Sequence, residues 1–306
     1  MSANLNSTGS DIGVRQNQPV VLRLLKARQW RWAVAVRWQM LQLALVLAAP
    51  ILTVTLGQLN PQTRPLISFI AICLAIADTS FFDRAYREAL KSAAKASELF
   101  DTALFHLDWS LLAAGKQPSP EETDRAERGW EKLRRPQPIT DWYSPEVDRA
   151  PLPLARAICQ RTNLSYDADL RTIYRNSLWG VAALVILALV AIGLSRKVEF
   201  SDFILGAWVP AGPFVAWTLR EAFRQADAIR ANEDALAEAE RLINAIITGQ
   251  MDPLAAEVGA RVLQNAIFAN RAKTVLLFPG IYRLQRADTE HKMHASADYW
   301  LTKAGI

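Results

Sequence analysis

The chain has 306 residues, 51% of them hydrophobic and 21% charged, and a formal net charge of +5 at pH 7. Its mean hydropathy of +0.05 averages long apolar runs with stretches dense in Arg, Glu and Ala. This length and composition predict an all-α membrane protein with one modest soluble part, and its two cysteines argue against a disulfide framework.

The excess positive charge is concentrated in the first 37 residues. Six basic residues stand there against Asp11, which gives the whole net charge of +5, and the rest of the chain cancels at 29 basic and 29 acidic residues. A basic segment before an apolar run orients a membrane helix or binds anionic lipid. A protein that coats DNA or RNA would spread its basic excess over a soluble domain. We therefore expect the lipid bilayer as a partner and no nucleic-acid polymer.

Residues 1–19 are polar and carry no periodic apolar pattern, so we expect a disordered N-terminus. Residues 20–38 alternate Leu, Trp and Val with Arg and Lys. This composition is typical of a basic interfacial helix, with aromatic rings at the level of the lipid headgroups. A plain basic lead-in to the first membrane span is an equally good interpretation.

Residues 39–82 form the first predicted transmembrane hairpin. Its spans, Met40–Leu56 and Leu66–Phe82, are each about 17 residues long, near the lower limit for crossing a bilayer. Asp78 lies one turn from the end of the second span. A carboxylate inside a membrane is a candidate functional site, although at a helix end it can simply reach the interface. Four cations lie between residues 84 and 95, and because basic flanks belong in the cytoplasm, both termini are predicted there.

Residues 83–177 are predicted to form a helical cytoplasmic insert. The periodicity predicts a helix over Arg84–Phe105, and the sequence PSPEE places a helix start with acidic residues in its first turn near Glu121. After several prolines, the segment Leu154–Arg175 is predicted to be helical and to run directly into the third span.

The second predicted hairpin covers residues 178–219. It has two apolar runs of about 17 residues joined by the charged connector Ser195–Asp202. Pro210, Gly212 and Pro213 lie within the fourth span and predict a kink with weakened backbone hydrogen bonding, a candidate gating element.

Residues 220–306 are predicted to form a cytoplasmic stalk and C-terminal helices. Ile229, Leu236 and Ile243 recur every seven residues. The stripe is read either as a coiled-coil seam, which would pair helices within a protomer or in a homo-oligomer, or as an ordinary core face. Gly249 and Pro253 predict the end of this helix.

The sequence holds no nucleotide-binding loop, nucleophile elbow or zinc signature, so we expect no enzyme, no metal and no cofactor. His291 and His294 share a helix face, but a closed metal site needs more ligands. His106 is interpreted as a packing residue. The richest polar constellation combines guanidinium forks, which suit phosphate oxygens, with rings that can stack on bases. Its candidate ligand-binding residues are Trp142, Tyr143, Arg149, Arg156, Gln160, Arg161, Asn163, Tyr166 and Arg171. The alternative is that these arginines pair with Asp148, Asp167 and Asp169 and fasten the helix to its neighbours.

Three segments carry a resemblance to a known family: FDTALFHLDWS at 100–110, WYSPEVDRAPLPLARAICQRTNLSYDADLR at 142–171, and LQNAIFANRAKTVLLFPGIYRLQRADTEHKM at 263–293. With the order of spans, they resemble the SMODS-associated four-transmembrane effectors of bacterial anti-phage signalling by cyclic oligonucleotides (CBASS). The resemblance implies a multi-pass protein of the bacterial inner membrane. It would form pores and cause abortive infection once a cyclic oligonucleotide from a CD-NTase-type synthase binds.

Two other functions stay open from the sequence. The first is a non-catalytic membrane scaffold or receptor whose cytoplasmic region binds protein partners. The second, a membrane enzyme, is the least favoured because no His, Cys or carboxylate motifs converge.

Overall fold

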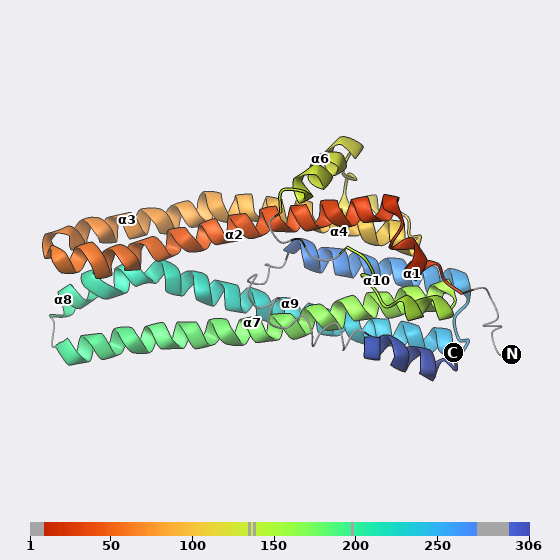
Figure 1. The fold of residues 1–306 in the computed structure, drawn as a ribbon. Coiled ribbons are helices and arrows are strands. Elements are labelled where there is room, and N and C mark those ends of the chain that lie inside the picture. The colour runs from red at the N-terminus through yellow and green to blue at the C-terminus, as the bar shows by residue number, and fades with distance from the viewer. Residues whose placement is uncertain (1–8, 134–135, 137–138, 197–198, 274–293) are drawn as a thin grey trace.

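A computed structural model describes residues 9–133, 136, 139–196, 199–273 and 294–306. Within these residues the chain is helical and contains no strand, and its long helices run side by side in an elongated bundle (Figure 1). The principal helices are α2 (Pro19–Leu59), α3 (Arg64–Ala77), α4 (Asp83–Phe105), α6 (Pro120–Trp130), α7 (Leu152–Arg196), α9 (Val209–Ile247) and α10 (Pro253–Lys273). The shorter ones are α1 (Ile12–Arg15), α5 (Leu111–Ala114) and α8 (Phe200–Phe203).

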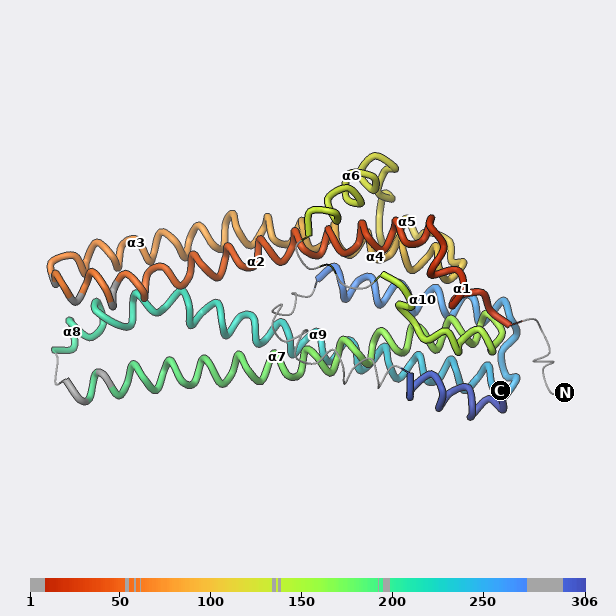
Figure 2. Tube along the Cα trace, viewed as in Figure 1, coloured from red at the N-terminus to blue at the C-terminus, as the bar shows by residue number. Residues whose placement is uncertain are grey.

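The long helices divide the bundle into two halves. We call residues 40–82 and 178–219 the apolar half and the remainder the polar half. The 45 residues of α7 extend about 68 Å at 1.5 Å per residue, twice the thickness of a hydrocarbon core. Figure 2 shows α2 and α7 running the length of the bundle, so each belongs to both halves.

Three helices among the described residues are long and apolar enough to cross a membrane, namely Pro19–Gly57, Arg64–Phe105 and Leu152–Ala191. These match the first three predicted spans. The fourth predicted span, residues 203–219, is not among them. It lies instead across a π-helical turn, Ile204–Trp208, and the first part of α9. Another π-helical turn, Asp78–Phe82, joins α3 to α4.

Exposed apolar side chains cover the apolar half. Leu184, Leu187 and Leu194 of α7 are each about two-thirds exposed or more, at 68%, 67% and 77%. In water these groups would carry the cost of apolar hydration, whereas lipid tails would solvate them without penalty. The apolar half is therefore built to face lipid.

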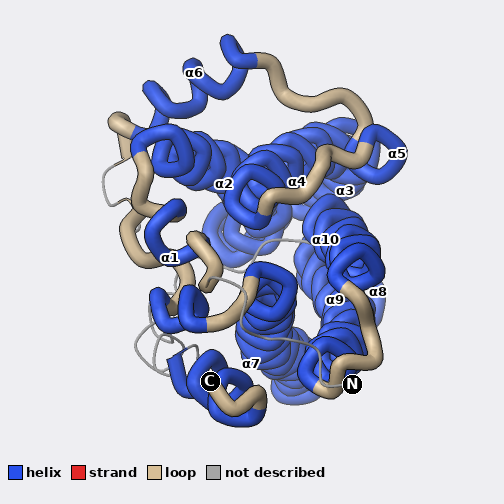
Figure 3. The backbone as a smooth tube through the Cα atoms, turned by 90° about the vertical axis from the view of Figure 1, so that its right-hand side faces the viewer, coloured by secondary structure: helices blue, strands red, loops and turns tan. Residues whose placement is uncertain are grey.

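One large core holds the polar half together. It joins α1, α2, α4, α7, α9, α10 and the C-terminal helix at residues 294–303, and Phe100, Leu154 and Leu263 are among its fully buried side chains. Figure 3 looks along the bundle from this end and shows α7, α9 and α10 gathered below α2 and α4.

The N-terminal segment differs from the disordered region that the sequence predicts. Ile12 is fully buried in the core, and the Asp148 carboxylate accepts hydrogen bonds from Gly13 N at 2.8 Å, Val14 N at 3.1 Å and Ser10 Oγ at 2.8 Å. These bonds satisfy the first amides of α1, so a polar segment without periodicity still packs. Residues 1–8 lie outside the described residues.

Residues 20–38 do not form a separate interfacial helix. They are the first half of α2, and Val21 and Leu25 are buried in the core of the polar half. The tryptophans expected at the headgroups contact other helices: Trp32 Nε1 donates to Ser97 Oγ at 2.9 Å. The continuous helix agrees with the simpler interpretation, a basic lead-in to the first span.

Other local predictions are confirmed. The helix predicted at PSPEE begins at Pro120, where Ser119 and Glu122 form a reciprocal capping box. The segment 154–175 runs unbroken into the third span within α7. The helix that starts in the fourth span ends at Ile247, and its predicted stripe faces the protein's own core, since Ile229 and Ile243 are 5% and 0% exposed.

Candidate functional site

A buried polar network lies at the centre of the polar half. Glu98 and Asp101 of α4 are 1% and 0% exposed, and both accept hydrogen bonds from Gln264 Nε2 of α10, at 2.9 and 3.1 Å. Arg261 forms an ion pair with Glu98, and Arg271 forms one with Asp101. Two carboxylates and two guanidinium groups therefore fasten α4 to α10.

Three residues of the predicted ligand-binding set extend this network along α7. Arg156 is 3% exposed and donates through Nε to the Phe105 carbonyl at 2.8 Å. Gln160 Nε2 donates to the Ala260 carbonyl and to Gln264, both at 2.9 Å. Arg161 donates hydrogen bonds through Nε and Nη2 to the Glu240 carboxylate of α9, at 3.0 and 2.8 Å. Each side chain joins α7 to a neighbouring helix.

Two of the three aromatic members of the set, Trp142 and Tyr143, lie close to this network. Tyr143 is buried, exchanges backbone hydrogen bonds with the Gln16 side chain, and accepts at its hydroxyl from Asn163 Nδ2. The Trp142 ring stacks under the Arg28 guanidinium, 4.5 Å from its centre. The structure thus brings Tyr143 against Asn163 of α7 and Trp142 against Arg28 of α2.

The remaining members are apart from that cluster. Arg171 is 4% exposed and binds Asp167 at 2.6 Å and Gln225 of α9 at 2.9 Å, within a second polar layer. Arg149 lies on the surface and pairs with Glu146 at 3.6 Å, while Tyr166 is half-buried on α7. The predicted pairing to Asp167 is present, whereas Asp148 caps α1 and forms no ion pair with an arginine of the described residues.

Burial controls the ionisation of the central network, which lies outside the apolar half. Desolvation raises the pKa of the Glu98 carboxyl, while hydrogen bonds from Gln264 and Arg261 lower it. Desolvation also raises the pKa of Tyr143 well above its usual value, with the nearby Asp101 charge adding to the effect. Tyr143 is therefore a neutral hydrogen-bonding group at any physiological pH.

A third polar layer marks the junction between the two halves. Asp78 does not simply reach outward, because its side chain is buried and accepts hydrogen bonds from Gln42 of α2 and from Arg220 Nη2 of α9, the latter at 2.7 Å. One turn further, Asp83 binds Arg224 of α9 at 3.0 Å. We call these contacts the junction layer, and they tie the first hairpin to α9.

The predicted kink lies in the same helix as the α9 residues of this layer, seven to ten residues before Arg220. Pro210 is in the first turn of α9, directly after the π-helical turn Ile204–Trp208, and Pro213 lies inside the helix. Each proline removes a backbone donor from the helix. A gating role for Pro210, Gly212 and Pro213 stays a prediction.

No group of three or more potential metal ligands occurs among the described residues. His294 contacts Ser144 Oγ at 3.1 Å, His106 contacts Asp11 at 3.0 Å, and His291 lies outside the described residues. What the arrangement offers chemically is a chain of largely buried ion pairs that joins the long helices α4, α7, α9 and α10. The carboxylates of α4 and their partners on α10 were missed from the sequence, because Asp101 and Arg271 are 170 residues apart.

Comparison with known proteins identifies the relatives of the chain. A family model described as the SMODS-associating 4TM effector domain matches residues 10–299. A protein of Bacillus cereus (strain VD146), described as a probable CBASS effector molecule, is 22% identical over 294 residues, which cover 91% of this chain and 94% of that protein. No solved structure matches the chain.

Proposed function

The chain belongs to the family of SMODS-associating 4TM effectors, and we propose that it is a multi-pass inner-membrane effector that permeabilises the membrane when a cyclic oligonucleotide binds its polar half. Its relationship to a probable CBASS effector supports this role. The messenger would come from a CD-NTase-type synthase, and the lost membrane barrier would stop growth of the infected cell.

The observation that carries the proposal is the continuity of the long helices through both halves. α7 passes from the central polar network at Arg156 to the lipid-facing leucines at 184–194 without a break. A continuous helix is a rigid element that can carry a displacement from one half to the other. A ligand that shifts α7 in the polar half would therefore move the apolar half, to the extent that it binds the two states with different affinity.

The junction layer is the element that such a shift would release. Separation of the first hairpin from α9 breaks the pairs of Asp78 with Arg220 and of Asp83 with Arg224. An unpaired buried charge costs several kcal/mol, about 3–5 for one partner removed. These pairs therefore favour the arrangement in which the first hairpin contacts α9. They stop opposing separation only when water enters and solvates the charges.

An open apolar groove of about 340 Å³ lies on the apolar half between α2, α7 and α9, lined by Pro50, Val185 and Phe214 among others. We propose that residues 203–219 complete a four-span bundle, with both termini in the cytoplasm, and that copies of the chain assemble around the path that opens.

The arginine and aromatic residues from Trp142 to Arg171 remain proposed ligand contacts. Their polar atoms bind protein groups in this structure, so a ligand would have to replace contacts such as Arg161 with Glu240. Exchange of one set of ion pairs for another is a direct way to couple binding to rearrangement.

The proposal is tested in cells that express the chain together with CD-NTase-type synthases, one at a time. We expect inner-membrane depolarisation and growth arrest with one active synthase and neither with its catalytically inactive form. An intact membrane potential with every synthase, together with a specific protein partner recovered from the membrane, would replace the proposal with the scaffold function.

A further inference from the structure

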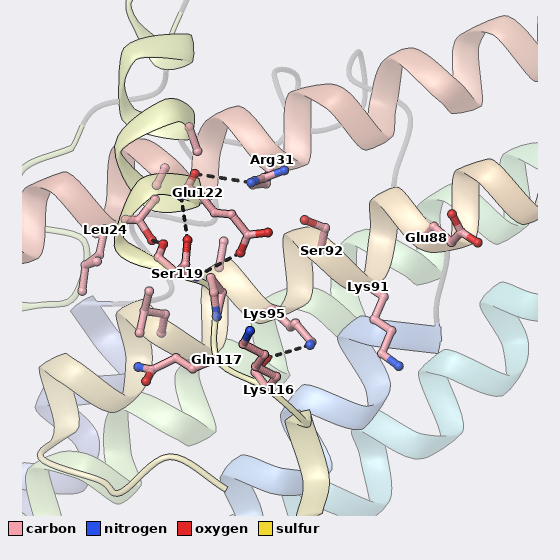
Figure 4. A pocket seen from close by; sticks show the side chains of 16 residues that line it. Leu24, Arg31, Glu88, Lys91, Ser92, Lys95, Lys116, Gln117, Ser119 and Glu122 are labelled. Carbon is pink, nitrogen blue, oxygen red and sulfur yellow. Dashed lines mark hydrogen bonds between the residues drawn. The ribbon is translucent and has the colours of Figure 1, made fainter. Parts of the chain in front are cut away.

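A groove of about 470 Å³ lies on the polar half between α2, α4 and the segment that leads into α6 (Figure 4). Its volume falls in the range of about 300–1,000 Å³ that is common for small-molecule sites. It is separate from the network around Arg156, because none of the nine predicted ligand-binding residues lines it.

The groove carries an excess of positive charge. Arg31 comes from α2, Lys91 and Lys95 from α4, and Lys116 from the segment before α6. Two carboxylates also line it, and both are engaged: Glu88 accepts from Arg84 Nε at 3.3 Å, and Glu122 accepts from Ser119 N at 3.0 Å in the capping box. Neither carboxylate accepts a hydrogen bond from one of the four cations.

Backbone contacts hold two of the cations in place. Lys95 Nζ donates to the Lys116 carbonyl at 2.8 Å, and Arg31 Nη2 contacts the Glu122 carbonyl at 3.4 Å. Figure 4 shows Arg31 above Ser119, and Lys95 and Lys116 below it. Over the part of the chain that the structure describes, no acceptor contacts the ammonium groups of Lys91 and Lys116, so their donors are available to a ligand.

From these observations we infer that the groove binds a phosphate-bearing ligand. Ammonium and guanidinium groups form short, charge-assisted hydrogen bonds to phosphate oxygens. The apolar side chains of Leu24, Leu99 and Pro118 also line the groove and suit the non-ionic part of such a ligand. The ligand class is an organic phosphodiester, which can come from a soluble cyclic oligonucleotide or from a lipid headgroup.

The position of the groove gives the site a regulatory role, a step that rests on the proposed function. Both α2 and α4 lead from the groove into the first hairpin, within the helical stretches Pro19–Gly57 and Arg64–Phe105. Lys91 is nine residues, or about 13 Å along the helix, beyond Phe82. A phosphodiester that bridges Arg31 and Lys91 would therefore act on both helices of that hairpin.

The test uses three full-length proteins: wild type, Lys91→Gln/Lys116→Gln, and Lys132→Gln/Lys273→Gln. The control pair also removes two exposed positive charges but lies outside the groove. In one arm, phosphatidylcholine nanodiscs carrying each protein are titrated with cyclic di- and trinucleotides. In the other, native mass spectrometry measures how much phosphatidylglycerol each protein retains.

A soluble ligand is identified if wild type and control bind one cyclic nucleotide equally and the groove variant binds it about tenfold more weakly or worse. A lipid ligand is identified if only the groove variant loses phosphatidylglycerol. Equal binding of every probe by all three proteins overturns the inference.

The inference and the proposed function fail in different ways. A groove variant that still leaks ions when the messenger is added would leave the effector function intact and refute the groove as the messenger site. If none of the messengers causes the wild-type protein to leak ions, the effector function is refuted. The lipid arm alone would then decide whether the groove binds phosphate.

Discussion

The buried pair of Asp101 and Arg271 offers a stability test of the central network. The Asp101 side chain is 0% exposed and that of Arg271 14%. Substitution Asp101→Asn leaves the guanidinium buried without its counter-charge, which costs about 3–5 kcal/mol. At about 2–4 °C per kcal/mol, the value for domains of 150–250 residues, the unfolding midpoint should fall by roughly 6–20 °C.

The matched control is Asp124→Asn, which removes an exposed i,i+4 partner of Arg128 in α6. Exposed pairs contribute about 0–1 kcal/mol, so the midpoint should move little. Thermal unfolding in detergent, followed by tryptophan fluorescence, measures both variants. In the double variant Asp101→Asn/Arg271→Gln the loss should be smaller than the sum of the single losses. Equal shifts for Asp101→Asn and the control would refute the assignment of the network as a buried ion-pair layer.

Three further changes test other parts of the structure. Asp78→Asn weakens the junction layer and should raise ion leakage from proteoliposomes without messenger. The control Asp202→Asn, on the exposed connector, should not raise it. Equal leakage from both variants would refute a role of the junction layer in gating. Gly129→Ala places a Cβ 2.4 Å from the Trp30 ring, so α6 should detach and trypsin should cut it faster, and unchanged cleavage would contradict this contact. Burial raises the pKa of Glu98 above its ordinary 4.5, so the folded state keeps this proton at pH values where the unfolded chain has lost it. The free energy of unfolding should therefore fall as the pH rises from 4.5 to the pKa of the folded state. Glu98→Gln should flatten this fall in the unfolding midpoint as the pH rises above 4.5, and parallel profiles would exclude Glu98 as its source.

Local signals were enough to predict several elements. The structure contains the capping box of Ser119 and Glu122 and the unbroken helix α7. Both depend on residues that are neighbours in the sequence. The order of the first three apolar helices follows from run length alone. The fourth, residues 203–219, has the same run length, but it contains two prolines and is flanked directly by Asp202 and Arg220, and these lower its hydropathy.

Contacts between distant segments could not be predicted in this way. One interpretation of the sequence paired Asp148 with an arginine, but Asp148 caps α1, because the N-terminal segment folds back across the start of α7. The partners of Glu98 and Asp101 lie more than 160 residues away on α10. The groove likewise combines cations from α2, α4 and the segment before α6, which only the packed bundle brings together.

The most direct test of the account is ion leakage from liposomes that carry the purified full-length protein, challenged with a panel of cyclic di- and trinucleotides. Arg156→Ala and Arg161→Ala, which alter the central network, run beside the wild type. We predict rapid leakage with one messenger, none with its linear hydrolysis product, and altered leakage in folded, inserted forms of both variants. Liposomes that stay sealed with every messenger, although the protein has inserted, would contradict it.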